Sequence, residues 1–210
     1  KVNSLENLWN KRRGRYELRS YDISKAKIPY GFVEKEYIFN SKTVWPDKLP
    51  ENFDLDKIIE YGKKPGLGIK KLHQKGITGK GINIGIIDGR LLVDHQEYKE
   101  NIKYYGETFD MKGTAFYHST PITSILAGKN IGVAPDVGVY YMAYLDNNID
   151  YEMGYKELAR AIEKLVEINK NLSKDKKLKV ISISSGWNPN SENAKGIYDA
   201  IKKHKNRIFL

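Results

Sequence analysis

The chain has 210 residues and a mass of 24.1 kDa, which is enough to bury a sizeable core without a disulfide or a metal. It is 40% hydrophobic and 30% charged, a globular composition that excludes a fibrous or wholly disordered protein. Because it contains no cysteine, disulfide scaffolds, zinc–cysteine sites and thiol nucleophiles are excluded together. The longest apolar run, residues 139–145, is far shorter than the ~20 residues of a membrane span, and residues 1–6 lack the apolar core of a signal peptide.

The chain is basic, with 36 lysines and arginines against 26 acidic residues. A net charge of +10 could bind phosphates, but arginine, the preferred residue for bidentate phosphate contacts, occurs only seven times. One dense basic cluster lies at residues 11–15, whereas lysines and glutamates alternate over residues 152–176 as on a solvated helix. We therefore do not expect a nucleic-acid partner.

Residues 1–66 are polar and aromatic, with prolines that interrupt any regular period. Residues 52–59 predict one short helix, with Asn52 or Asp54 as its N-cap. We expect this segment to be an N-terminal extension, either the remnant of a pro-segment or an added surface element.

Residues 67–210 alternate between strand and helix patterns. The β-branched runs 81–87, 137–145 and 179–183 predict buried strands, and the apolar spacing over 155–172 and 191–203 predicts helices. This alternation is typical of an α/β domain, in which a mainly parallel sheet carries helices on both faces. Residues 207–210 look like the start of another buried strand, so we expect further chain to follow.

The glycines at residues 79–81 do not make a nucleotide-binding motif. A phosphate loop needs Ser or Thr after Gly-Lys, where this chain has Gly81, and a dinucleotide fingerprint needs its glycines after the strand instead of before it. A tight turn into the strand explains these residues better.

Asp88 and His118 are the candidate chemical groups. Asp88 follows the buried run 84–87, so it is expected at the carboxyl end of a central parallel strand, where open α/β sheets place their sites. Residues 117–128 predict a short helix that ends at Gly128, with Ser119 or His118 near its start. On its own, Asp88 is better explained as a turn or helix-cap residue, and the segment around His118 is what favours a chemical role.

Five segments in chain order resemble the subtilisin-like serine peptidases, or subtilases, over residues 67–210. They are 79–88 (GKGINIGIID), 95–98 (HQEY), 118–128 (HSTPITSILAG), 132–135 (GVAP) and 180–186 (VISISSG). They are similar, respectively, to the strand leading to the catalytic aspartate, the segment after it, the helix with the catalytic histidine, the turn that follows, and the strand that pairs with substrate. The resemblance implies a serine-type endopeptidase domain.

The resemblance also implies roles for particular residues. His118 would be the general base and acid, and Asp88 would orient its ring. Ser184, Ser185 and Gly186 would pair with an extended polypeptide substrate. Such peptidases are commonly exported, so a location outside a bacterial cell or at its envelope is expected.

This chain departs from the subtilase pattern at two positions. Arg90 stands close to Asp88 in sequence, where its cation could pair with the carboxylate in place of His118. Ser119 follows the histidine where the family has glycine, so its side chain must fit where the backbone is usually bare.

The resemblance places the oxyanion asparagine beyond the strand that begins at Arg207, and the Gly-Thr-Ser nucleophile segment further on. The chain contains no Gly-Thr-Ser or Gly-x-Ser-x-Gly segment, so we expect both groups to be missing from these 210 residues. We expect the 210 residues alone to be inert and to need the remaining C-terminal part of the peptidase domain as a partner. The alternative is a non-catalytic subtilase relative that binds peptides or regulates.

No cofactor or metal is expected, with calcium as the one candidate considered. Asp146, Asn148, Asp150 and Glu157 have some of the spacing of a calcium loop, but Tyr151 stands where the sharp-turn glycine is required. A polar loop leading into a helix explains the same residues. The other histidines, 73, 95 and 204, are expected in packing or solvated positions.

Overall fold

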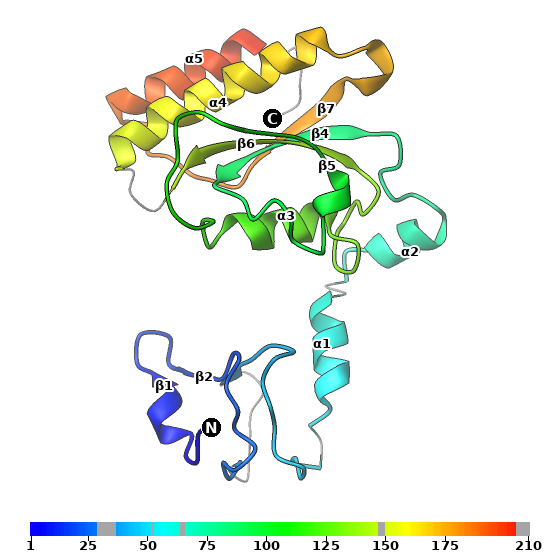
Figure 1. Ribbon diagram of the computed structural model, residues 1–210, viewed down its shortest axis with the longest axis vertical. Coiled ribbons are helices and arrows are strands. Elements are labelled where there is room, and N and C mark those ends of the chain that lie inside the picture. Colours follow the sequence, from blue (N-terminus) through cyan, green and yellow to red (C-terminus); the bar gives the residue numbers. More distant parts are fainter. Residues whose placement is uncertain (29–36, 52, 64–65, 147–149, 205–210) are drawn as a thin grey trace. The chain divides into compact units, whose positions relative to one another are not determined.

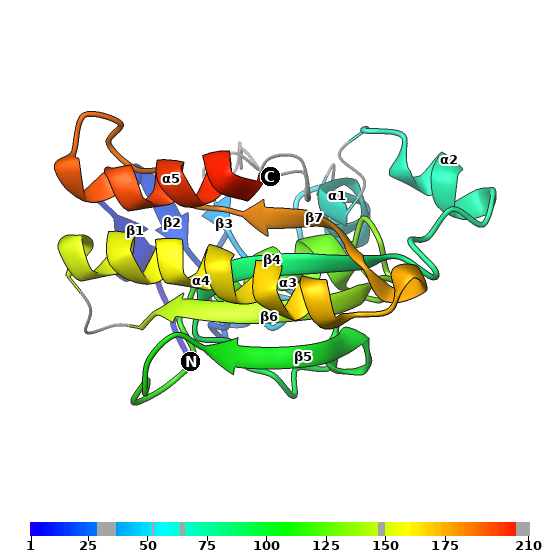
Figure 2. The same ribbon diagram turned by 90° about the horizontal axis from the view of Figure 1, so that it is seen from above.

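The computed structural model describes residues 1–28, 37–51, 53–63, 66–146 and 150–204, and within these ranges the chain forms two compact units, residues 1–67 and 68–210. In the described parts of the second unit, four parallel strands form a sheet in the order β5-β6-β4-β7 (Figure 2). These strands are β4 (Asn83–Gly89), β5 (Ile102–Glu107), β6 (Gly138–Leu145) and β7 (Leu178–Ile183). The predicted α/β class with a parallel sheet is therefore confirmed.

Helices cover both faces of this sheet, as the alternating pattern predicted. Figure 1 shows α4 and α5 on one face and α3 on the other. The helices of this unit are α2 (Ile69–Gln74), α3 (Ser119–Ala127), α4 (Tyr151–Asn171) and α5 (Lys195–His204), with short 3₁₀ turns at Lys99–Asn101, Lys174–Lys176 and Glu192–Ala194. None of the described helices is long and apolar enough to cross a membrane.

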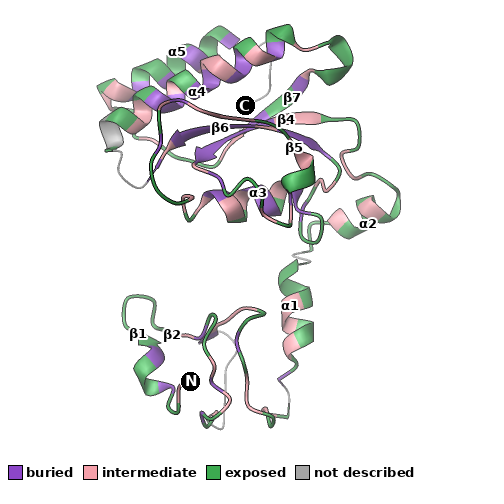
Figure 3. Ribbon diagram, in the orientation of Figure 1, coloured by how far each residue is buried: buried purple, intermediate pink, exposed green. Residues whose placement is uncertain are grey.

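The core of the second unit consists of two clusters, because neighbouring strand residues point to opposite faces. Ile87 and Met142 pack with α4 and α5 residues such as Leu165, whereas Ile86 and Tyr141 belong to the cluster on the other side. Figure 3 shows buried residues on the strands and on the helices, and among the strands β4 and β6 are the most buried. Gly85 leaves room for this packing, since a Cβ there would lie 3.0 Å from Leu165 Cδ1.

The start of one predicted helix changes, and one strand was missed. Asp150 begins α4 earlier than expected, because its side chain accepts a hydrogen bond from the Met153 amide and caps the helix. The strand β5 was not predicted, because its sequence, IKYYGE, contains no long apolar run. The strand expected at 207–210 lies outside the described residues.

The first unit is built from much shorter elements. They are a 3₁₀ turn (Glu6–Leu8), β1 (Trp9–Asn10), β2 (Arg15–Glu17), β3 (Tyr37–Ile38) and α1 (Leu55–Lys63). The predicted helix is present, and Asp54 caps it by accepting a hydrogen bond of 2.9 Å from the Lys57 amide. Asn52, the other candidate cap, lies outside the described residues.

Candidate active site

Asp88 lies in β4, near the carboxyl end of the strand. The strand pairs with β6 on one side and β7 on the other, and its register with β6 shifts between Asp88 and Gly89. The aspartate is 4% exposed. A carboxylate this buried requires hydrogen-bond donors, because burial without them would be costly.

His118 comes from the segment that leads into α3. It is the N-cap residue of that helix, as the sequence predicted. Just before it, the Phe116 amide donates a hydrogen bond of 2.8 Å to the carbonyl of Arg90, which joins this segment to the end of β4. The His118 side chain is 37% exposed, so one side of its ring is open to a reactant.

The two residues form a direct pair. His118 Nδ1 lies 2.9 Å from Asp88 Oδ2 and 3.1 Å from Oδ1. An ionised carboxylate can only accept hydrogen bonds, so Nδ1 carries the proton and the neutral ring keeps Nε2 as an acceptor. This is the tautomer that a histidine general base requires.

Two further donors reach the Asp88 carboxylate at Oδ1. The Gly89 amide donates over 2.6 Å and the Ser119 hydroxyl over 3.0 Å. Ser119 is fully buried, so its side chain fits at the position where the resemblance would place glycine. Sequence reasoning identified the substitution but not the hydrogen bond, because nothing in the sequence gives the direction of this hydroxyl.

The expectation that Arg90 could pair with Asp88 in place of His118 is wrong. Arg90 Nε lies 3.4 Å from Glu107 Oε1, and its guanidinium also donates to the Gly113 carbonyl. Glu107 ends β5, the strand that the sequence analysis missed, so the acidic partner of Arg90 could not be identified beforehand. The carboxylate of Asp88 therefore remains bonded to His118.

Tyr141, on the neighbouring strand β6, supports the same region. Its hydroxyl donates a hydrogen bond of 2.7 Å to the carbonyl of Gly89. Burial, and secondarily the nearby charge of Asp88, raises the pKa of Tyr141, so this hydroxyl stays protonated and acts as a donor at neutral pH. The sequence pattern predicts that Tyr141 lies in a strand, but it does not predict this hydrogen bond.

The three predicted substrate-binding residues follow the end of β7. Ser184, Ser185 and Gly186 are all exposed and lie beyond the last strand residue, Ile183. Ser185 accepts a hydrogen bond of 2.9 Å from the Tyr144 hydroxyl. Because β7 stands at an end of the described sheet, the segment after it is accessible to another extended chain.

A pocket of about 310 Å³ connects this segment with the histidine segment. Ser185 and Gly186 line it together with Phe116, two residues before His118. The rest of the lining comes from the end of β6 and the start of α4, namely Tyr144, Leu145, Asp146, Asp150, Gly154, Tyr155 and Leu158. The pocket is thus mainly apolar with a few polar groups, the usual character of a ligand site.

The remaining histidines do not join the Asp88–His118 pair. His73 Nε2 lies 2.9 Å from the carbonyl of Val133, and the ring of His95 stacks on that of Tyr98. His204 Nε2 lies 2.9 Å from Glu163 Oε2, with its side chain buried between α4 and α5.

Within the described residues no group of three or more histidine and acidic side chains could hold a metal ion. Of the residues weighed for calcium, Asp150 caps α4, and Asn148 lies outside the described ranges. The calcium candidate therefore gains no support from the described side chains.

Comparisons with known proteins give three informative results, although no family model matches the chain. The subtilisin-like protease PopC of Myxococcus xanthus is 24% identical over 148 residues, which cover 60% of this chain and 31% of PopC. Ribonuclease Z of Thermococcus sibiricus is 33% identical over 107 residues, which cover 46% of this chain and 33% of that protein. This chain thus spans about a third of the length of each curated relative.

The third result is structural. The prenylagaramide maturation protease PagA superimposes with a TM-score of 0.52 at 21% identity, covering 69% of this chain and 49% of the PagA chain. This fold agrees with the PopC match and with the parallel sheet and its order of segments. The unit that carries Asp88 and His118 therefore has a subtilisin-like fold.

Proposed function

We propose that this chain is part of a serine-type endopeptidase of the subtilase kind. The observation that carries the proposal is the pair of Asp88 and His118, bonded over 2.9 Å, with the carboxylate buried and the ring partly open. A buried acceptor that fixes one histidine tautomer is what a general base needs, and a solvated surface pair would not supply it.

In the proposed reaction His118 acts at its second ring nitrogen. Nε2 would take the proton of a serine hydroxyl as that oxygen attacks the peptide carbonyl, and would then donate the proton to the departing amine. Asp88 would hold the ring and stabilise its charged form in between.

The serine and the oxyanion asparagine are proposed to come from the rest of a longer protein. The 210 residues contain no Gly-Thr-Ser segment, and they span only about a third of the length of PopC. The chain by itself is therefore proposed to be inert, since the pair lacks both a nucleophile and an oxyanion donor.

The substrate is proposed to be a polypeptide bound in extended form. Backbone groups of Ser184, Ser185 and Gly186 would pair with it, and a substrate side chain would enter the pocket that Phe116 and Tyr155 help to line. Pairing through the backbone fixes the position of the peptide without requiring one sequence. No cofactor is assigned a role in this reaction, and we propose a site of action outside a bacterial cell or at its envelope.

The test uses the natural protein that contains these residues, at its full length, with a casein digest as the assay. We expect hydrolysis and labelling by a fluorophosphonate, which reacts with an activated serine. His118→Ala and Asp88→Asn should each lower kcat/KM by about 10⁴-fold or more, because the base or its tautomer is lost. His73→Ala, a histidine in another environment, should retain activity.

The controls also address the competing activities. The 210-residue chain should neither label nor hydrolyse casein. Because one relative is called a ribonuclease, RNA is incubated in parallel and should remain intact. Peptide binding by the full-length protein without labelling would instead support the non-catalytic alternative.

A further inference from the structure

We infer that Ser119 is a positioning residue that holds Asp88 in the orientation required by His118. The inference rests on the proposed function, because it concerns the same pair. It assigns a role to a side chain that stands where the resemblance would place glycine.

The inference starts from how the hydrogen bonds divide between the two carboxylate oxygens. Oδ1 accepts from the Gly89 amide over 2.6 Å and from the Ser119 hydroxyl over 3.0 Å. Oδ2 receives the shorter of the two contacts from His118 Nδ1, at 2.9 Å. Two donors therefore fix one oxygen, and the other is presented to the imidazole.

This division matters because the last torsion of an aspartate side chain is soft. The bond to the planar carboxylate has broad, roughly twofold minima, so a single contact would leave the oxygens free to rotate. The Gly89 amide fixes one direction, and the Ser119 hydroxyl supplies a second from a different element, α3. Rotation away from this arrangement would break two charge-assisted hydrogen bonds at once.

Burial makes these bonds effective. Ser119 is fully buried and the Asp88 side chain is 5% exposed, so water cannot readily replace the hydroxyl. An acceptor that loses its donor in such a place pays the full cost of desolvation.

Two other roles for Ser119 fit the geometry less well. A serine at a helix start usually caps the helix by accepting from a nearby amide, but this hydroxyl donates to Asp88. Nor is it placed to act as a nucleophile, because it is buried and its proton is already committed to the carboxylate.

The hydroxyl lies in a region that is itself well held. Thr123 Oγ1 donates to the Ser119 carbonyl over 2.9 Å, which fastens the first turn of α3. On the other side of Asp88, the Tyr141 hydroxyl holds the Gly89 carbonyl. Both donors to Oδ1 thus belong to backbone segments that are fixed independently of His118.

The decisive experiment is NMR of the full-length natural protein that contains these residues, and it requires no catalysis. The experiment measures two properties of the proton on His118 Nδ1: its chemical shift and its rate of exchange with water. Ser119→Ala should move the resonance upfield and increase exchange about tenfold, the factor expected for loss of one hydrogen bond to a charge. Ser119→Gly should do the same, and Ser119→Thr, which keeps a hydroxyl, should restore the signal.

Ser124→Ala is the matched control, since Ser124 lies on the same helix and is also buried. It should leave the His118 proton unchanged. The inference is overturned if Ser119→Ala and Ser119→Gly leave both shift and exchange as in the original chain, or if Ser124→Ala has the same effect. Should Ser119→Thr fail to fold, the alanine and glycine variants still decide.

Kinetics of the full-length protein separate this inference from the proposed function. Ser119→Ala should lower kcat about tenfold with little change in KM, because the base is disturbed and peptide binding is not. If the unchanged protein hydrolyses no peptide, the proposed function fails, while the NMR result still shows whether Ser119 orients Asp88. If hydrolysis occurs but Ser119→Ala leaves kcat unchanged, the positioning role fails and the peptidase stands.

Discussion

The two units of the chain differ in the length of their secondary-structure elements and in the size of their cores. In residues 68–210, strands of six to eight residues form a parallel sheet between layers of helices, and most residues of β4 and β6 are buried. In residues 1–67, strands of two or three residues surround a small core of buried residues such as Leu18 and Ile23. Long strands and helices organise the larger unit, whereas short elements and ring contacts, such as those of Trp9 with Tyr16 and of Phe39 with Trp45, occur in the smaller one.

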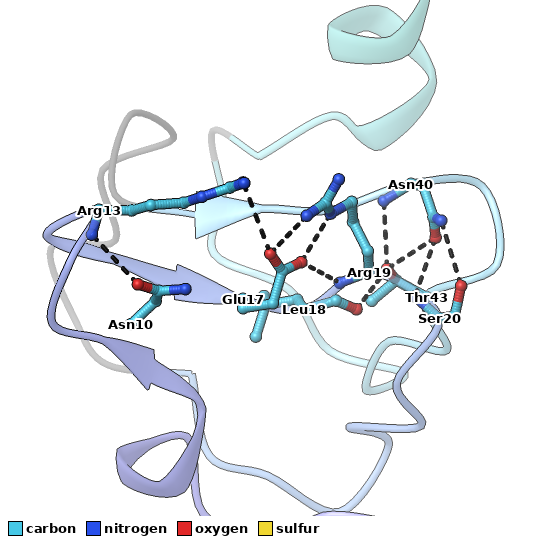
Figure 4. Close-up of polar contacts among 8 residues, drawn as sticks. All are labelled: Asn10, Arg13, Glu17, Leu18, Arg19, Ser20, Asn40 and Thr43. Carbon is cyan, nitrogen blue, oxygen red and sulfur yellow. Dashed lines mark hydrogen bonds and ion pairs between the residues drawn. The ribbon is translucent and has the colours of Figure 1, made fainter. Parts of the chain in front are cut away.

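The two units also differ in how deeply they bury a hydrogen-bonded carboxylate. Asp88 is buried and is held by donors from β4 and α3. Glu17, in the first unit, sits between Arg13 and Arg19 near the surface, as Figure 4 shows. Carboxylates with similar partners should therefore contribute very differently to the free energy of unfolding. Water screens the contacts of Glu17 at the surface, whereas it does not screen the buried contacts of Asp88.

The largest effect on stability should come from matched leucines in the two cores. Leu165 and Leu18 are both fully buried, the first on α4 in the core of the larger unit and the second in the small unit. We expect Leu165→Ala to lower the free energy of unfolding by about 4–5 kcal/mol and Leu18→Ala by about 2–3 kcal/mol, because a layered core collapses less readily around a cavity. Urea denaturation, with local hydrogen exchange for each unit, measures both. Equal losses, or a larger loss for Leu18→Ala, would contradict the comparison.

The same contrast explains how much of the fold could be predicted. The strands β4, β6 and β7 were found because apolar β-branched runs have few alternative structures, and α4 because its apolar residues share one face. The strand β5 was missed, since Tyr104 and Tyr105 give it no continuous apolar run. In the first unit, the strands are too short for any period to appear in the sequence, and β3 pairs with β2 from a distant position.

The candidate site was predictable in its residues but not in its contacts. Asp88 could be selected because open α/β sheets carry their sites at the carboxyl ends of parallel strands, and His118 because it stands at the start of a predicted helix that resembles the histidine helix of the subtilases. The partners of Ser119 and Arg90 could not, because each depends on the direction of a side chain toward an element remote in sequence. The assignments of these residues to catalysis remain predictions.

An intermediate effect is expected at Thr43 in the first unit. Its hydroxyl donates a hydrogen bond of 2.8 Å to the Leu18 carbonyl, and this bond is buried. Figure 4 shows both residues. Thr43→Val, which is similar in shape but lacks the donor, should lower the free energy of unfolding by about 1 kcal/mol. Thr43→Ser keeps the hydroxyl and should lose less. If the valine variant is the more stable of the two, the side-chain bond does not contribute as the comparison requires.

The smallest effect is expected at Glu17, and it should depend on pH. Hydrogen bonds from Arg19, at 2.7 Å to each carboxylate oxygen, outweigh partial burial and lower the pKa of Glu17. Because the folded-state pKa lies below the unfolded one, the stabilisation is present above the unfolded pKa and is lost as pH falls through the folded pKa. Glu17→Gln should therefore cost about 0–1 kcal/mol at pH 7 and nothing in strong acid.

The Glu17 prediction is checked by thermal unfolding at several pH values and by NMR titration of the carboxyl group. Arg19→Lys is the matched variant, since it keeps the charge but cannot form the two-pronged contact. It should raise the pKa of Glu17 toward the ordinary glutamate value and leave Asp88 and His118 undisturbed. A loss at pH 7 as large as that of Leu18→Ala would mean that the surface network stabilises the small unit as strongly as its core does, and the contrast between the two networks would then fail.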